Sequence, residues 1–143
     1  MTSTVQDMPK KPVVSTATRR TFLGPVVGTK YAVDVGDTTV AVELHDLPRM
    51  ARFLLPANAI LGRARDRLVE DTGGRVVAAR DALRGGFPAR QVTYELERPA
   101  RVEEALLVLV ERRLYIALAT WPSGSAIPPA AQRLFESFEV WPP

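Results

Sequence analysis

The chain has 143 residues, a formal net charge of +3 and no cysteine. A chain of this length can form one domain with a substantial core, and without cysteine it has neither disulfides nor thiolate metal sites. Residues 1–30 hold five basic residues and one acidic residue, whereas the rest of the chain holds fourteen basic and fifteen acidic residues. Because binding to nucleic acid requires a sustained positive field on the folded part, we expect no nucleic-acid partner.

Residues 1–20 are rich in Thr, Ser, Pro and Lys and show no hydrophobic periodicity. Such a segment buries too little apolar surface to offset its ordering entropy. We therefore predict a disordered basic leader, followed by a single domain over residues 21–143. The segment that starts at Thr18 resembles a twin-arginine export motif, but Gly24 and Pro25 interrupt the apolar stretch that an export signal needs. We predict a cytoplasmic protein, and no stretch has the roughly 20 apolar residues of a membrane span.

The first half of the folded part is predicted to be a β-hairpin followed by a helix. Residues 31–44 show two alternating, β-branched runs around a Gly-Asp turn, which is the pattern of paired strands. Residues 49–56 are expected to form an irregular connection. Asn58 would then cap a helix that runs to about Asp71. Gly73 follows it, and glycine favours the left-handed conformation that ends helices.

Four predicted strands and a last helix make up the second half. The strands are expected over residues 75–81, 89–97, 102–110 and 113–121, and their short connections predict an antiparallel meander. The third of these strands is apolar on both faces, which is typical of a strand covered on both sides of the sheet, so we place it in the centre.

The chain ends in a predicted helix and a short strand. Pro128 and Pro129 open a helix to about Glu136, and Phe138 to Trp141 would form the last strand. Together the elements predict an α+β domain, in which an antiparallel sheet of about six strands, rich in meanders, is flanked by helices.

The chain offers little material for catalysis or metal binding. His45 is the only histidine; His45-Asp46 resembles a metal-binding dyad of phosphohydrolases, and Glu43 lies on the same side of its strand. Such a site needs further histidines and carboxylates, so we interpret His45 as a strand-end residue in contact with water. Glu103 and Glu104 are expected to be solvated and to point to opposite faces. We predict no catalytic residue, no cofactor and no metal.

A few residues are candidates for contact with a partner protein. Arg112 and Arg113 occupy a predicted hairpin tip, where they would attract an acidic partner, although a charged turn also occurs without one. Tryptophan is enriched at interfaces, but we favour core positions for Trp121 and Trp141. The candidate partner-binding residues are Phe87, Arg112, Arg113, Trp121 and Pro122.

Several short motifs are shared with a known superfamily. They are the turn Gly86-Phe87-Pro88-Ala89-Arg90, the strand start Arg113-Leu114-Tyr115, and the terminal helix Arg133-Leu134-Phe135-Glu136-Ser137-Phe138. Over roughly residues 30–141, the chain resembles the PsbP-like superfamily. That superfamily includes bacterial DcrB-type domains, the Ran-binding Mog protein, the PsbP subunit of photosystem II and the Eag-type chaperones of type VI secretion effectors. The chain departs from the pattern where Glu111-Arg112 replaces a frequent Gly-Asn turn and Ala89 replaces a common glycine. The resemblance implies a PsbP/Mog-like sandwich and a non-catalytic domain that binds other proteins.

These observations lead to one prediction of function and two alternatives. We predict a non-catalytic bacterial protein-interaction or assembly module, either an adaptor or a chaperone-like subunit. The first alternative is a small-molecule or lipid-binding domain with a pocket between sheet and helix. The second is an unrecognised enzyme, which the shortage of acid–base residues near neutral pH disfavours.

Overall fold

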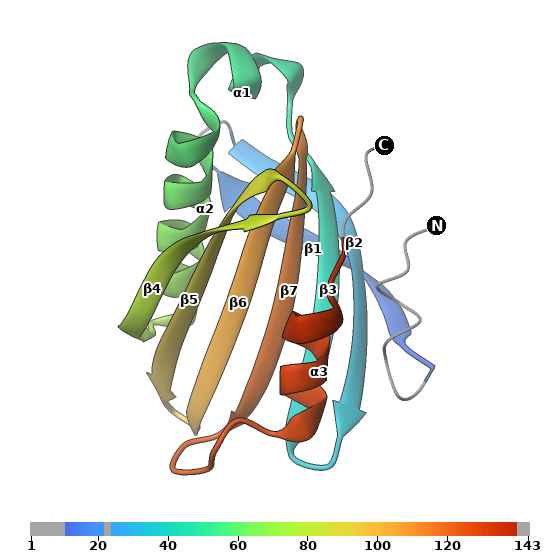
Figure 1. The fold of residues 1–143 in the computed structure, drawn as a ribbon, viewed down its shortest axis with the longest axis vertical. Helices are drawn as coiled ribbons and strands as arrows, with labels where there is room; N and C mark the ends of the chain where they lie inside the picture. Colours follow the sequence, from blue (N-terminus) through green and yellow to red (C-terminus); the bar gives the residue numbers. More distant parts are fainter. Residues whose placement is uncertain (1–10, 22–23, 140–143) are drawn as a thin grey trace.

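Seven strands form one antiparallel sheet with helices on both faces (Figure 1). The computed structural model describes residues 11–21 and 24–139. In chain order the elements are β1 (Val13–Thr21), β2 (Gly24–Val35), β3 (Thr38–Asp46), α1 (Arg49–Leu54), α2 (Ala57–Thr72), β4 (Arg75–Arg84), β5 (Phe87–Glu97), β6 (Ala100–Val110), β7 (Arg113–Pro122) and α3 (Pro129–Ser137). The strand order is β1-β2-β3-β7-β6-β5-β4, so two meanders meet where β3 pairs with β7. The α+β class is confirmed, with seven strands in place of about six.

Strand β1 overturns part of the predicted disorder over residues 1–20. It pairs with β2 along its whole length, from Val13 opposite Ala32 to Thr21 opposite Gly24. Residues 1–10 lie outside the described part of the chain. The segment is poor in large apolar residues, but its threonines and valines favour extended backbone, and β2 supplies the hydrogen-bond partners. The prediction from composition failed because it considered only what the segment buries, not what it pairs with.

The start of each of the first two helices also differs from the prediction. The expected irregular connection over residues 49–56 contains the six-residue helix α1. Helix α2 follows Pro56 and has no side-chain cap, so Asn58 lies in its first turn instead of capping it. Gly73 ends α2 in the left-handed conformation, with φ 69°, as predicted. None of the described helices is long and apolar enough to cross a membrane.

Each face of the sheet has its own apolar core and its own helix. Helix α2 contacts β1, β5 and β6 on one face, and α3 contacts β3 and β7 on the other. Because β1 is an edge strand and β5 lies near the opposite edge, contact of both with α2 means that the sheet curls around this helix. Strand β6 is buried on both faces from Ala105 to Val110, as its apolar run predicted, although β7 is the middle strand of the seven.

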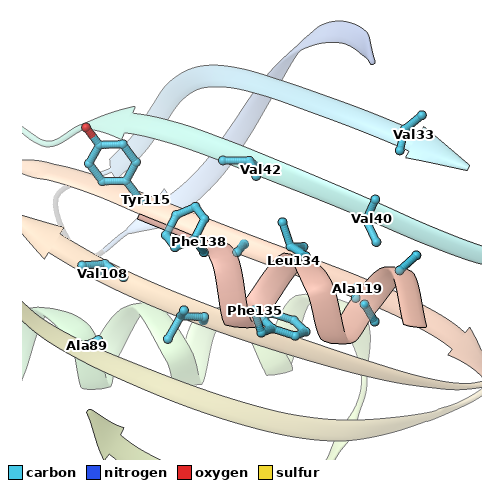
Figure 2. Close-up of a cluster of buried hydrophobic side chains, with 14 of the residues drawn as sticks. Val33, Val40, Val42, Ala89, Val108, Tyr115, Ala119, Leu134, Phe135 and Phe138 are labelled. Carbon is cyan, nitrogen blue, oxygen red and sulfur yellow. The ribbon is translucent and has the colours of Figure 1, made fainter. Parts of the chain in front are cut away.

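Helix α3 and the residue that follows it close the second face with three large apolar side chains. Figure 2 shows Leu134, Phe135 and Phe138 directed onto the sheet beside Val42 and Tyr115. The rings of Tyr115 and Phe138 meet edge to face, with centroids 6.4 Å apart and planes at 70°. The sequence predicted a strand over residues 138–141. Residues 138 and 139 do not form a strand, and residues 140 and 141 lie outside the described part of the chain.

We expect Phe138→Ala to lower the free energy of unfolding by about 3–5 kcal/mol, because it opens a cavity in the α3 core. Phe53→Ala is the matched control. Phe53 is 88% exposed, so its loss should change stability by no more than about 0.5 kcal/mol. Urea unfolding followed by fluorescence measures both, and equal losses in the two variants would contradict the assignment of Phe138 to the core.

Candidate functional site

Three polar side chains form a buried network on the face of the sheet that α2 covers. The Nε of Arg19 donates to Oε1 of Glu43 at 2.8 Å, and its Nη2 donates to Oε2 at 2.5 Å. The Nε2 of His45 lies 2.9 Å from the same Oε1. The side chains of Glu43 and His45 are 0% and 1% exposed, so the interpretation of His45 as a residue in contact with water is wrong. A bidentate guanidinium–carboxylate pair of this kind is both strong and directional.

The sheet register explains how these residues come together. Glu43 and His45 lie two residues apart on β3, so they share a face. Strand β2 separates β3 from β1, and its Gly28 lies opposite His45. A Cβ at Gly28 would lie 2.1 Å from the carbonyl oxygen of Leu44 and 2.5 Å from His45 Nδ1. Gly28 therefore provides the space that the imidazole ring occupies.

The network fixes the protonation of Glu43. Burial alone would raise the pKa of Glu43, but hydrogen bonds from His45 and Arg19, together with the charge of Arg19, lower it to about 2. Glu43 is thus an ionised acceptor, so the His45 Nε2–H donates to it. His45 Nδ1 has no hydrogen-bond partner among the described residues. Glu43, itself held by His45, thus fixes the position of the Arg19 guanidinium.

Two further carboxylates on β6 also have specific partners. Glu103 accepts a hydrogen bond from the Thr120 hydroxyl at 2.9 Å and another from the Tyr94 hydroxyl. Burial raises the pKa of Glu103, although the bond from Thr120 and the charge of Arg19 act in the opposite direction. Glu104 accepts from Gln91 at 2.5 Å. The sequence predicted that both side chains are solvated, and this prediction is wrong. The prediction that they point to opposite faces of the sheet is correct.

A cavity of about 320 Å³ lies between α2 and the sheet, beside Arg19. Its wall is mostly apolar, and the charged residues on its edge come from β1 and α2. The apolar lining residues are Leu47, Pro48, Ala51, Ile60, Ala64, Leu68, Leu114 and Ile116, and the polar ones are Arg19, Thr21, Arg63, Asp66, Arg67, Glu70 and Asp71. Glu43 and His45 do not line the cavity. No group of three or more His, Cys, Asp or Glu residues that could hold a metal occurs in the described part of the chain.

The structure separates the candidate partner-binding residues. Arg112 and Arg113 lie at the β6–β7 turn, and Phe87 begins β5 at the same end of the sheet. Trp121 and Pro122 lie at the opposite end, where Pro122 pairs with the start of β6. Trp121 is 4% exposed in the α3 core, as the core interpretation predicted. Trp141 lies outside the described residues.

The two arginines of the turn hold the end of β3. Arg112 Nη1 donates to the Leu47 carbonyl at 3.0 Å, and Arg113 Nε donates to Asp46 at 3.0 Å. The Leu47 N–H donates in return to the Arg112 carbonyl at 2.8 Å. These contacts fix the segment that leads into α1.

Helix α1 presents an apolar surface that the sequence analysis missed. Met50, Phe53 and Leu54 are 61%, 88% and 56% exposed, and we call these three residues the α1 surface. Their spacing is that of one helix face, while Ala51 on another face is buried. This spacing was the signal in the sequence, and it was lost because the segment was interpreted as irregular.

We expect Glu43→Gln to lower the free energy of unfolding at neutral pH by about 3–5 kcal/mol, because the charge of Arg19 loses its partner. The folded-state pKa of Glu43, about 2, lies below the ordinary value of 4.5. Its stabilising contribution is therefore complete above that ordinary value and is lost as the pH falls towards 2. The difference between wild type and variant should shrink over this range in urea titrations. A difference independent of pH would contradict the assignment, and Glu97→Gln, at an exposed position, is the control.

We expect Gly28→Ala to destabilise the fold by about 1–3 kcal/mol, because its Cβ overlaps the Leu44 carbonyl and the His45 ring. Gly62→Ala on α2 is the matched control, since a Cβ there meets nothing within 4 Å. That variant should gain up to about 1 kcal/mol from helix propensity. Thermal unfolding of both variants measures the contrast, and a neutral Gly28→Ala would show that the imidazole does not occupy this space.

No protein-family model matches the chain, and no curated protein matches it in sequence. Among solved structures, the chain is similar to the crystal structure of PA94 from Pseudomonas aeruginosa, a protein of unknown function described as a candidate regulator. The TM-score is 0.58 at 11% sequence identity, over 94% of this chain and 87% of that chain. Such a similarity shows a shared fold and assigns no ligand or partner. Membership of the PsbP-like superfamily stays a prediction.

Proposed function

We propose that this domain is a protein-interaction or assembly module, an adaptor or a chaperone-like subunit, and that a partner protein binds at the α1 surface. The observation that carries the proposal is the exposure of Met50, Phe53 and Leu54 on one face of one short helix. Large apolar side chains that gather on a surface mark a contact with another macromolecule. The resemblance to PsbP-like domains, which bind proteins, supports the same proposal.

The α1 surface is preformed. Ala51 is 1% exposed and anchors the helix on the domain, and the paired hydrogen bonds between Leu47 and Arg112 hold the segment that precedes it. A surface held in place before binding loses less conformational entropy when the partner arrives.

Arginines around the α1 surface indicate the chemistry of the partner. Arg49 and Arg52 belong to α1 itself and are exposed, and exposed Arg112 lies next to its start. No described residue forms an ion pair with Arg49 or Arg52. Two acidic residues lie nearby. Asp46 forms an ion pair with Arg113, and Glu111 is exposed at the β6–β7 turn. An apolar patch with a positive rim suits an amphipathic segment that carries acidic residues.

We propose binding and not catalysis because of where the acid–base residues lie. His45 and Glu43 are buried against each other and Arg19. Neither of them lines the cavity beside the network. A general base must come within hydrogen-bond reach of its substrate, and these two side chains are sealed in the sheet.

We expect a photo-crosslinker at position 53 to capture one partner protein in the native host, in stoichiometric amount. Phe53 is replaced by p-benzoylphenylalanine, and the same substitution at Leu83, which is 70% exposed on β4, is the matched control. The double variant Arg49→Glu/Arg52→Glu should reduce the crosslinked yield by about tenfold, since it reverses the charge of the rim.

Two results would contradict this proposal. One is recovery of the domain alone, at low salt and after crosslinking from position 53. The other is an equal set of crosslinked proteins from positions 53 and 83, which would indicate nonspecific contact. A partner whose crosslinking is insensitive to the two arginine substitutions would overturn the acidic character assigned to it.

A further inference from the structure

The cavity under α2 points to a second binding activity, which does not rest on the α1 surface. We propose that the cavity binds a small amphiphile with an apolar body and a carboxylate head, and that Arg19 receives the head. The sequence left open, as an alternative function, a small-molecule or lipid-binding domain with a pocket between sheet and helix. This proposal names the chemical class of the ligand for such a pocket. Its failure would leave the proposed protein interaction unaffected, because the two sites use different residues for contact.

The size and lining of the cavity suit an apolar body. The space has a volume of about 320 Å³ and is partly open to solvent, so a ligand can enter it. It lies at the lower end of the range for small-molecule sites, which are mostly apolar with a few polar groups. Leu114 and Ile116 of β7 form the wall on the sheet side, and Ile60, Ala64 and Leu68 of α2 face them across the space.

The charged side chains on the edge favour an anionic head. Two of the three lining arginines lie deeper than the acids: the side chains of Arg19 and Arg67 are 25% and 36% exposed, whereas those of Asp66 and Glu70 are 65% and 70% exposed. Arg63 and Asp71 are also exposed. Water and salt screen exposed charges more than buried ones. A head inside the cavity therefore interacts more strongly with the two arginines than with those two acids.

Arg19 has hydrogen-bond donors to spare. A guanidinium group has five N–H donors, and the bonds to Glu43 use the Nε and one from Nη2. No described residue accepts a hydrogen bond from the other three. Glu43 and His45 hold the guanidinium in a fixed orientation, and a donor group oriented before binding costs less to engage. A carboxylate is the head that matches such a planar set of donors.

The test compares three ligands of equal chain length with different heads: decanoate, decanol and decyltrimethylammonium. Each is titrated below its micelle concentration into the ¹⁵N-labelled protein, and amide shifts are followed by NMR. We expect decanoate to shift amides of α2 and β7 and to bind at least tenfold more tightly than decanol, with no binding of the cation. Equal affinities for decanoate and decanol would overturn the role of Arg19. Absence of shifts in α2 and β7 with every ligand would overturn the site.

Two variants separate the body from the head. Ala64→Phe fills the cavity and should abolish decanoate binding, whereas Ala59→Phe, five residues earlier on α2 and outside the lining, should leave it unchanged. Arg19→Gln should lower the affinity for decanoate to that for decanol. If the loss of Arg19 unfolds the domain, two comparisons remain. The Ala64→Phe and Ala59→Phe variants test where the ligand binds, and decanoate against decanol on the wild-type protein tests which head group is preferred. Binding that survives Ala64→Phe would overturn the proposal.

Discussion

The ion pair between Arg19 and Glu43 ties the edge of the sheet to its interior. It spans β2, so it links the first and third strands of the sheet without a backbone contact between them. Removing two charges from water is costly, and only close geometry with additional hydrogen bonds compensates for it. Here the bidentate pairing, and the third bond from His45, supply that compensation. The pair links β3 to the edge strand β1, which contacts α2 and contributes Arg19 and Thr21 to the lining of the cavity.

The two faces of the sheet differ in what they can do. The α3 face is packed with large apolar side chains, among them the edge-to-face pair of Tyr115 and Phe138 (Figure 2). The α2 face holds the buried network and the cavity. Helix α1 contributes to both proposed sites: Ala51 lines the cavity, while Met50, Phe53 and Leu54 form the surface on the outside.

Sequence patterns predicted the features that depend on near neighbours. The apolar run of β6, the left-handed end of α2 at Gly73 and the core position of Trp121 all follow from local composition and spacing. The missed features depend on distant residues. β1 is ordered because β2 pairs with it, and His45 is buried because Gly28 makes room for its ring and Arg19 completes its network. The motif spacing that placed Glu43 and His45 on one face was correct, but no local pattern named a third member 24 residues away.

The distribution of charge also depends on residues that are distant in sequence. A count of charges by segment assigns the positive charge of residues 1–30 to a leader separate from a neutral domain. In the structure burial raises the pKa of Glu103, and the charges of Arg19 and Lys30 act against this rise. Charges that are far apart in sequence therefore act on the same carboxylate inside the sheet. A fragment that began at residue 21, the domain boundary suggested by composition, would lack Arg19 and leave Glu43 buried without its cation. Such a carboxylate must either become protonated or draw water into the sheet, so the domain includes β1 for electrostatic reasons as well as for its hydrogen bonds.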